Sequence, residues 1–226
     1  SQPPVIGGTD TGSVTEDVDP DTNTLLETSG ILTISDPDAG ESEFVGETIA
    51  GTYGNLTIDA IGNWSYAADN TQTIIQQLGE GASVSDTLAV TTADGTQHDV
   101  VITLTGANDA PTIEIALTDQ TATEAEAFSF SFAADSFADI DTSDSLSYTA
   151  TLETGDPLPV WLTFDEGTRT FSGTPADTDV AVLSVEVTAQ DVTGATASDI
   201  FTLTVNDISQ PPVIGGTDTG SVTEDV

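Results

Sequence analysis

The stretch FTLTV at Phe201–Val205 alternates apolar and polar residues, and this pattern recurs along the whole chain. Every second side chain of a β-strand points to the same face, so the alternation predicts strands that bury one face. Further stretches of this kind lie at residues 31–34, 56–58, 64–66, 88–90, 100–104, 128–132 and 182–187. Seven or so short strands in about 100 residues indicate a Greek-key β-sandwich, and the chain is long enough for two. We therefore expect an all-β fold of two tandem sandwiches, with one short helical turn within residues 72–78.

The charge of the chain is strongly one-sided, with 39 acidic residues against one arginine and no lysine, which gives a formal net charge of −38. Nucleic acids and anionic lipids are held through Lys and Arg, so neither is an expected partner. The chain has no cysteine, which excludes disulfides and cysteine zinc sites. No apolar run approaches the roughly 18 residues of a membrane helix, and no signal peptide opens the sequence. We therefore expect a soluble fragment without membrane insertion.

Mutual repulsion among so many carboxylates disfavours a compact fold, because the chain has almost no cation of its own to offset it. Divalent cations or high salt are the candidate sources of positive charge. Carboxylate oxygens prefer Ca²⁺ among the common metals, so Ca²⁺ is the expected cofactor. Without disulfides, bound metal is also the remaining means of stabilising small secreted domains.

One stretch of the sequence occurs twice. Ser1–Val18 reads SQPPVIGGTDTGSVTEDV, and Ser209–Val226 reads the same at an offset of 209 − 1 = 208 residues. This match indicates one period of a tandem array and the start of the next copy, although an engineered duplication would give the same pattern. We expect domains at residues 1–108 and 109–208, with residues 209–226 as the first strand of a third copy. That strand has no core of its own, so it should be loosely ordered or should pair with the sheet edge of a neighbouring molecule.

Acidic residues recur in the predicted loops of both halves. In an immunoglobulin-like sandwich, successive loops alternate between the two ends, so acidic loops gather at defined poles. One pole should carry Asp36, Asp38 and Asp94 in the first half and Asp139, Asp141 and Asp191 in the second. The opposite pole should carry Glu16 and Glu80 in the first half and Glu124 and Asp177 in the second. Plain turn chemistry is the alternative explanation for the residues at 36, 38, 139 and 141, since Asp suits tight loops.

Two sets of motifs resemble known repeat families. The first half carries GNWSY at 62–66 and TADGT at 92–96, and it resembles the VCBS-type cadherin-like repeat over most of its length. The second half carries LPVWLTF at 158–164 and FSGTP at 171–175, and it is similar to the dystroglycan-type cadherin-like domain. The resemblance implies immunoglobulin/cadherin-like sandwiches from a large bacterial adhesin of the RTX type. Such adhesins are exported by type I secretion to the cell surface, where these domains form a stalk.

The cadherin resemblance also implies Ca²⁺ between consecutive domains, held by one domain, the linker and the facing pole of the next. For the junction inside the chain, the implied ligands are Glu16, Glu80, Asn108, Asp109, Asp139, Asp141 and Asp191. At the outer pole of the first half, Asp36, Asp38 and Asp94 would form half of a site with a preceding domain. At the far end, half of a site with the next copy would comprise Glu124, Asp177, Asn206 and Asp207. Asp17–Asp21 begins like an EF-hand loop but lacks its glycine and terminal glutamate, so we interpret it as a solvated acidic loop.

Little in the sequence indicates catalysis. His98 lies on an alternating strand without a nucleophilic serine nearby, and we expect a partly exposed strand residue there. Trp64 and Trp161 are expected to pack in the core. Arg169 is expected to make a surface ion pair with Asp165 or Glu166 across a hairpin.

The sequence therefore predicts a mechanical protein and not an enzyme: a calcium-stiffened extender segment that projects a distal ligand-binding region from the bacterial surface. Its expected partners are the neighbouring repeat domains of the same chain, while other domains bind the distal ligand. We expect a monomer. The alternative is an adhesion module that binds carbohydrate or another copy of itself through loops or a strand edge.

Overall fold

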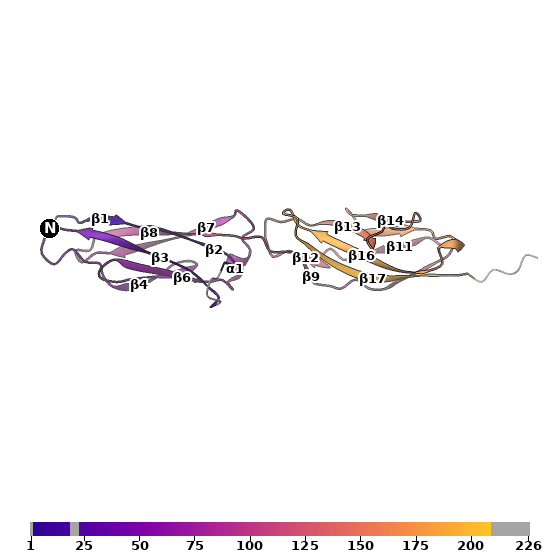
Figure 1. The fold of residues 1–226 in the computed structure, drawn as a ribbon, viewed down its shortest axis with the longest axis horizontal. Coiled ribbons are helices and arrows are strands. Elements are labelled where there is room, and N and C mark those ends of the chain that lie inside the picture. Colours follow the sequence, from indigo (N-terminus) through magenta and orange to yellow (C-terminus); the bar gives the residue numbers. More distant parts are fainter. Residues whose placement is uncertain (1, 19–22, 209–226) are drawn as a thin grey trace, which may run out of the picture. The chain divides into compact units, whose positions relative to one another are not determined.

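The computed structural model describes residues 2–18 and 23–208, and it is nearly all-β (Figure 1). About half of the chain is strand and 3% is helical, which confirms the predicted fold class. By its internal contacts the chain divides into two compact units. Among the described residues, the first comprises those up to Ile115 together with Asp135–Tyr148 and Thr188–Ser198, and the second comprises Ala116–Ala134, Thr149–Val187 and residues 199–208. The domain boundaries at residues 108 and 208 stay predictions, and the expectations for residues 209–226 fall outside the described residues.

The first unit contains a five-stranded sheet in the order β1-β3-β6-β5-β4 and a three-stranded sheet in the order β2-β8-β7. The strands are β1 Val5–Gly8, β2 Thr11–Thr15, β3 Leu25–Ser35, β4 Glu47–Ala50, β5 Gly54–Ile58, β6 Asn63–Asp69, β7 Ser83–Thr91 and β8 Gln97–Thr105. Neighbours are antiparallel except that β2 runs parallel to β8. The single α-helix of the described residues, α1, spans Thr73–Gln76 and confirms the helical turn predicted within residues 72–78.

The core of this unit is built by the alternation seen in the sequence. On β6, Trp64 and Tyr66 are buried while Ser65 between them is exposed, and β8 buries Val100, Ile102 and Leu104 with partly buried residues between them. Full burial of an aliphatic or aromatic side chain contributes about 1.5–3 kcal/mol, so these few residues account for much of the stability of the unit. The predicted core position of Trp64 is confirmed.

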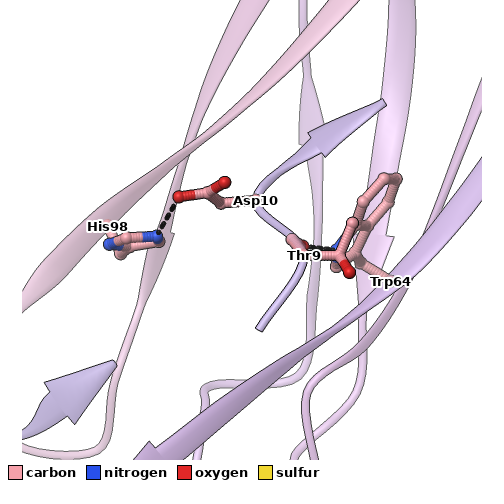
Figure 2. Close-up of polar contacts among 4 residues, drawn as sticks. All are labelled: Thr9, Asp10, Trp64 and His98. Atoms are coloured by element: carbon pink, nitrogen blue, oxygen red, sulfur yellow. Dashed lines mark hydrogen bonds and ion pairs between the residues drawn. The ribbon is translucent and has the colours of Figure 1, made fainter. Parts of the chain in front are cut away.

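The N-terminal segment joins both sheets of the first unit. β1 is the edge strand of the five-stranded sheet, and β2 is the edge strand of the three-stranded sheet. Between them the indole Nε1 of Trp64 donates to the carbonyl oxygen of Thr9 at 2.8 Å, as Figure 2 shows. In the same view Nε2 of His98 lies 3.4 Å from Oδ2 of Asp10. The side chain of His98 is 28% exposed, which confirms the prediction of a partly exposed strand histidine.

The remaining strands form three further sheets, in the orders β12-β9, β11-β15-β14 and β10-β17-β16-β13. Their bounds are β9 Thr112–Ile113, β10 Gln120–Thr123, β11 Phe128–Ser131, β12 Phe137–Ala138, β13 Ser147–Leu152, β14 Leu162–Asp165, β15 Thr170–Gly173, β16 Val182–Gln190 and β17 Thr196–Asn206. A short 3₁₀ turn, η1, spans Asp177–Asp179. In the second unit the rings of Phe164 and Phe201 both lie against Phe171, with centroids 4.6 and 5.3 Å away, and form an aromatic core.

Two predictions for the second unit need correction. Trp161 is only partly buried, and its ring meets Phe128 edge-on at 6.4 Å. The predicted ion pair of Arg169 is wrong, because the described structure contains none between Arg169 and Asp165 or Glu166. Arg169 adopts the left-handed conformation at the hairpin turn, with φ 52°, while Oδ1 of Asp165 accepts the backbone N–H of Thr168 at 3.1 Å. The carboxylate therefore serves the turn and does not neutralise the guanidinium.

The buried carboxylate of Asp86 accepts hydrogen bonds from the backbone of the loop between β4 and β5. Asp86 on β7 is 2% exposed and accepts a hydrogen bond of 2.6 Å from the hydroxyl of Tyr66. It also accepts hydrogen bonds from the backbone N–H groups of residues 52–54. Burial alone would raise the pKa of Asp86, but these donors outweigh it and hold the pKa below its ordinary value.

Replacing Asp86 by asparagine should lower the free energy of unfolding by about 1–3 kcal/mol, because donors aimed at two carboxylate oxygens lose an acceptor. Since the pKa of Asp86 is depressed in the folded state, the contribution is present above the unfolded pKa and is lost as the pH falls through the folded value. Urea unfolding at pH 7 measures the change. Asp99→Asn, which removes a charge from an exposed position on β8, is the control and should leave the midpoint unchanged. Equal effects from the two variants would contradict this assignment.

Candidate metal centre

Three groups of carboxylates in the described residues lie close enough to share a cation. Within each group, one ligand oxygen per residue lies within 4.8 Å of the others. The groups are Asp36, Glu41 and Asp94; Asp139, Asp144 and Asp191; and Glu124, Asp177 and Asp207. Each contains at least two predicted ligands, so the loops that the sequence assigns to common poles do meet.

The group around Asp139 gathers further oxygens in the first compact unit, and we call the whole set the central acidic cluster. Its members come from four places: the end of β2, the chain after β8, the loop between β12 and β13, and the turn after β16. They are Glu16, Asp17, Asn108, Asp109, Asp139, Asp141, Asp144 and Asp191. Six of the seven predicted junction ligands therefore come together.

Hydrogen bonds fix the orientation of these side chains. Nδ2 of Asn108 donates to Oδ2 of Asp191 at 3.0 Å, and the backbone N–H of Asp109 donates to Oδ2 of Asp141 at 3.0 Å. The backbone N–H of Asp141 in turn donates to Oδ1 of Asp139 at 3.0 Å. Among the described residues, the other oxygens of Asp139 and Asp141 have no hydrogen-bond partner, whereas Oδ1 of Asp191 accepts from Thr193, Gly194 and Ala195.

Glu16 enters the cluster from the end of β2. Nε2 of Gln76 on α1 donates to Oε1 of Glu16 at 2.9 Å, and the backbone N–H of Ala107 donates to Oε2 at 3.4 Å. Glu16 is 1% exposed, so its carboxylate has little access to water. The loop after β12 is tied to the same end of the sheets, because Thr142 donates from its backbone N–H to the carbonyl oxygen of Gln77 at 3.3 Å.

Several oxygens of the cluster are buried and have no hydrogen-bond partner. They are Oδ1 of Asn108 and Asp141 and Oδ2 of Asp109, Asp139 and Asp144. Asp141 as a whole residue is only 2% exposed. A buried carboxylate oxygen without a donor is costly, and buried polar atoms in native proteins are almost always paired. All five atoms are acceptors, so a cation would pair them together.

The pKa values show how strongly the metal-free cluster resists ionisation. The pKa of Glu16 is raised to about 7, chiefly by burial; the charges of Asp109, Asp17 and Asp141 add to the rise, and the hydrogen bond from Ala107 opposes it. Burial also raises the pKa values of Asp109, Asp139 and Asp141, and neighbouring carboxylates add to the effect. A divalent cation among these oxygens would reduce the repulsion by offsetting part of the negative charge.

Asp191 behaves differently from its neighbours. Burial raises its pKa, but hydrogen bonds from Asn108, Thr193 and the backbone N–H groups of Gly194 and Ala195 outweigh burial and hold the pKa below its ordinary value. Asp191 is therefore a fixed negative charge at the base of the cluster. An array of hard oxygen donors from carboxylates and one amide, without nitrogen or sulfur ligands, fits Ca²⁺, which takes six to eight oxygens.

The other two groups contain part of their predicted ligands. Asp36 and Asp94 lie together as expected, whereas Asp38 donates its backbone N–H to Oδ1 of Asp36 at 2.7 Å and accepts the N–H of Gln2 at 2.9 Å. The carboxylate of Asp38 therefore holds the N-terminal segment at Gln2 and is not part of the group. In the second unit Glu124, Asp177 and Asp207 meet, while the contact described for Asn206 is its backbone carbonyl, which accepts the N–H of Glu124 at 2.9 Å.

Sequence reasoning overlooked Glu41 and Asp144 as candidate ligands and included Glu80 without support from the structure. Glu41 follows Asp36 by five residues in one loop, and Asp144 follows Asp141 by three. This closeness within a single loop is the sequence feature that could have identified both as candidate ligands. Glu80 is exposed, and within the described residues no hydrogen bond joins it to the central acidic cluster. Asp17, which the sequence places at the start of a solvated acidic loop, acts electrostatically on Glu16, Asp109 and Asp141.

Two protein-family models match the chain. Residues 1–106 match the bacterial cadherin-like domain family. Residues 110–206 match the putative Ig domain family. Domains of the bacterial cadherin-like family are typically extracellular and typically bind calcium. No curated protein matches the chain. Within residues 2–18 and 23–208, no helix is long and apolar enough to cross a membrane.

Solved cadherin structures share the fold. The extracellular cadherin domains 1–5 of protocadherin gamma B2 superpose with a TM-score of 0.61 and 16% identity, over 92% of this chain and 40% of that chain. Human mucin-like protocadherin EC1-2 gives a TM-score of 0.52 and 15% identity, over 92% of this chain and 100% of that chain. At these identities the likeness shows a cadherin-like fold. The chain spans less than half of the five-domain protocadherin.

The raised pKa of Glu16 predicts that the metal-free chain loses stability as the pH rises. The folded state holds a proton on Glu16 between its ordinary pKa of 4.5 and about 7, where the unfolded state has released it. Stability from this residue is therefore fully present below the unfolded pKa and is lost as the pH passes through about 7, by up to about 3 kcal/mol.

Urea unfolding in chelator across this pH window tests the point. Glu16→Gln, which imitates the protonated form, should flatten the profile. Glu80→Gln removes an exposed charge nearby in sequence and should leave the profile unchanged. A wild-type profile that stays flat through the window would show that Glu16 ionises normally in the folded chain.

Proposed function

We propose that the chain is a calcium-stiffened extender segment in the stalk of a bacterial surface adhesin. The observation that carries the proposal is the central acidic cluster. Glu16 comes from the part that matches the bacterial cadherin-like family, and Asp139, Asp141 and Asp191 come from the part that matches the Ig family. Oxygens of Asp139 and Asp191 lie close enough to share a cation, and Oδ1 of Asp141 is buried without a partner. The charge of Asp141 also acts on Glu16, so a cation bound here would connect both parts of the chain.

The residues have distinct roles in this proposal. Asp139, Asp141, Asp144 and Asp191 would hold the ion with Asp109 and Glu16, and the ion would supply the positive charge that the chain lacks. Asn108 and the backbone N–H of Asp109 hold two of these carboxylates in place. The linker at Asn108-Asp109 thereby becomes part of the site, so that its conformations are restricted once the carboxylates share a cation. Restricted linker conformations at each junction would hold consecutive domains in an extended, stiff array, as a spacer requires.

The wider setting follows from the sequence. The repeated 18-residue stretch supports membership of a tandem array, and the VCBS-type and dystroglycan-type motifs support an adhesin of the RTX type exported to the cell surface by type I secretion. In this setting the neighbouring repeats are the partners, and other domains bind the distal ligand. Large negative charge suits such a stalk, because similar copies repel one another and do not associate through their sheets.

The two other functions have less support. Both matched families are usually non-catalytic, which argues against an enzyme. An adhesion module that binds sugars would present aromatic rings for stacking, but Trp64 is 2% exposed and its indole N–H is bound to Thr9. We therefore place ligand recognition outside this chain.

Calcium should stabilise the chain through the central acidic cluster. At 100 times its dissociation constant, a ligand that binds only the folded state adds about 2.7 kcal/mol, which corresponds to a rise of several degrees in the melting temperature. Asp141→Asn should weaken calcium binding at least tenfold and remove most of this rise. Asp135→Asn deletes one charge from an exposed position before β12 and is the matched control.

Calorimetric titration and thermal melting with calcium or chelator measure both effects. Small-angle scattering should in addition show a longer and stiffer particle with calcium than with chelator. Identical melting curves in the two conditions would refute calcium binding. A stabilised chain with an unchanged scattering profile would retain calcium binding but refute the stiffening of the linker.

A further inference from the structure

Gln76 on α1 contacts two carboxylates of the central acidic cluster through a single atom. Its Nε2 donates to Oε1 of Glu16 at 2.9 Å and to Oδ1 of Asp17 at 3.1 Å. An amide nitrogen carries two hydrogens, so each carboxylate receives one of them. The amide oxygen in the same place would face two carboxylate oxygens, so the two acids determine which end of the Gln76 amide points toward them.

The backbone of α1 fixes the position of this nitrogen. Ile75 is 0% exposed, and the backbone N–H of Gln76 donates to the carbonyl oxygen of Gln72 at 3.0 Å, so the helical turn is anchored in the core. The carbonyl oxygen of Gln77 accepts hydrogen bonds from the backbone N–H and the hydroxyl of Thr142, at 3.3 and 3.2 Å. The side chain of Gln76 therefore starts from a backbone that is held on both sides.

A second neutral amide holds Asp17 beside Gln76. Asp17 has φ 56°, and Asn70 contacts it twice. Nδ2 of Asn70 donates to Oδ1 of Asp17 at 2.8 Å, and Oδ1 of Asn70 accepts the backbone N–H of Asp17 at 3.4 Å. Oδ1 of Asp17 therefore receives hydrogens from two amides. Neither amide has a net charge, so the two adjacent carboxylates are brought together without being neutralised.

Glu16 divides its two oxygens between α1 and the linker. Oε1 accepts from Gln76, while Oε2 accepts a long hydrogen bond of 3.4 Å from the backbone N–H of Ala107, which precedes Asn108. One oxygen of Glu16 is therefore engaged by the amide, and the other lies toward the linker residues of the proposed calcium site.

We propose that Gln76 takes the place of a cation between Glu16 and Asp17, and that this residue limits the central acidic cluster to one calcium ion. A cation shared by two carboxylates lies where their oxygens converge, and here the amide nitrogen occupies that position. The inference rests on the proposed function, because it concerns how many ions the same cluster takes. A donor at position 76 closes the second ion position, and an additional carboxylate there opens it.

Gln76→Glu in the full chain tests the proposal. The substitution replaces the donor by a third carboxylate of nearly the same shape, and three carboxylates with water can supply the six to eight oxygens that Ca²⁺ takes. Equilibrium dialysis at saturating calcium should therefore count one more ion per chain than in the wild type. Ions at other carboxylate groups add equally to both counts. Adding Asp17→Asn to Gln76→Glu should return the count to the wild-type value.

Ile74→Glu is the matched control. It adds the same charge to α1 at a side chain that is 51% exposed, and residues two apart on a helix do not face each other. Its calcium count should equal that of the wild type.

Gln76→Lys provides a second test, which needs no metal. The chain has no lysine, and an ammonium group at this position would offset the charge of both carboxylates. The melting temperature in chelator should rise by about 2–4 °C, while the calcium count stays at the wild-type value. Ile74→Lys carries the same charge on the other side of α1 and should give less than half of this rise.

The proposal is overturned if Gln76→Glu binds no more calcium than the wild type or stays unfolded at saturating calcium. It is equally overturned if Gln76→Lys and Ile74→Lys have the same melting temperature in chelator. Failure of the proposed function is a separate result, because it appears as a wild-type chain that binds no calcium. An ion gained by Gln76→Glu in that case would still support the role of Gln76.

Discussion

Repulsion among carboxylates that the fold brings together and buries is the constraint on which the rest of this structure depends. A chain with a formal charge of −38 and one arginine cannot neutralise Asp139, Asp141 and Asp191 internally. The fold nevertheless removes them from water and leaves oxygens such as Oδ1 of Asp141 without a donor. A raised pKa at Glu16 and its neighbours shows the same conflict. These features are reconciled if the folded state is completed by a cation from outside.

The scaffold and the cluster are physically continuous. β2 is the edge strand of the three-stranded sheet and buries Val14 in the core. Two residues later, directly after β2, Glu16 lies in the cluster. α1 contributes Gln76, which orients that carboxylate. Edge-strand packing, set by the alternation of small and apolar residues in the N-terminal segment, therefore controls where an acidic ligand lies. Displacement of β2 from the sheet edge would therefore remove Glu16 from the cluster as well.

The sequence predicts the strands well and the cluster in part, for different physical reasons. Period-two alternation reflects burial directly, so the core positions of Trp64 and the β8 residues follow from it. Loop acids such as Asp139 and Asp191 follow from the alternation of loops between poles. Side-chain direction within a loop depends on local turn geometry, which spacing alone does not determine. The carboxylate of Asp38 consequently binds the backbone of Gln2 and lies outside the group, while Asp144, which the sequence did not predict as a ligand, belongs to one. The ion pair predicted for Arg169 is wrong because its side-chain direction depends on the left-handed backbone conformation at the hairpin turn, which the alternation of apolar and polar residues does not predict.

The most direct test of the central claim is a crystal structure of the chain grown with excess calcium and analysed for anomalous scattering. The account predicts an ion among Asp139, Asp144 and Asp191, with oxygens of Asp109 and Asp141 also in its coordination shell. Well-ordered side chains at these positions that point into solvent, with no anomalous peak between them, would contradict it.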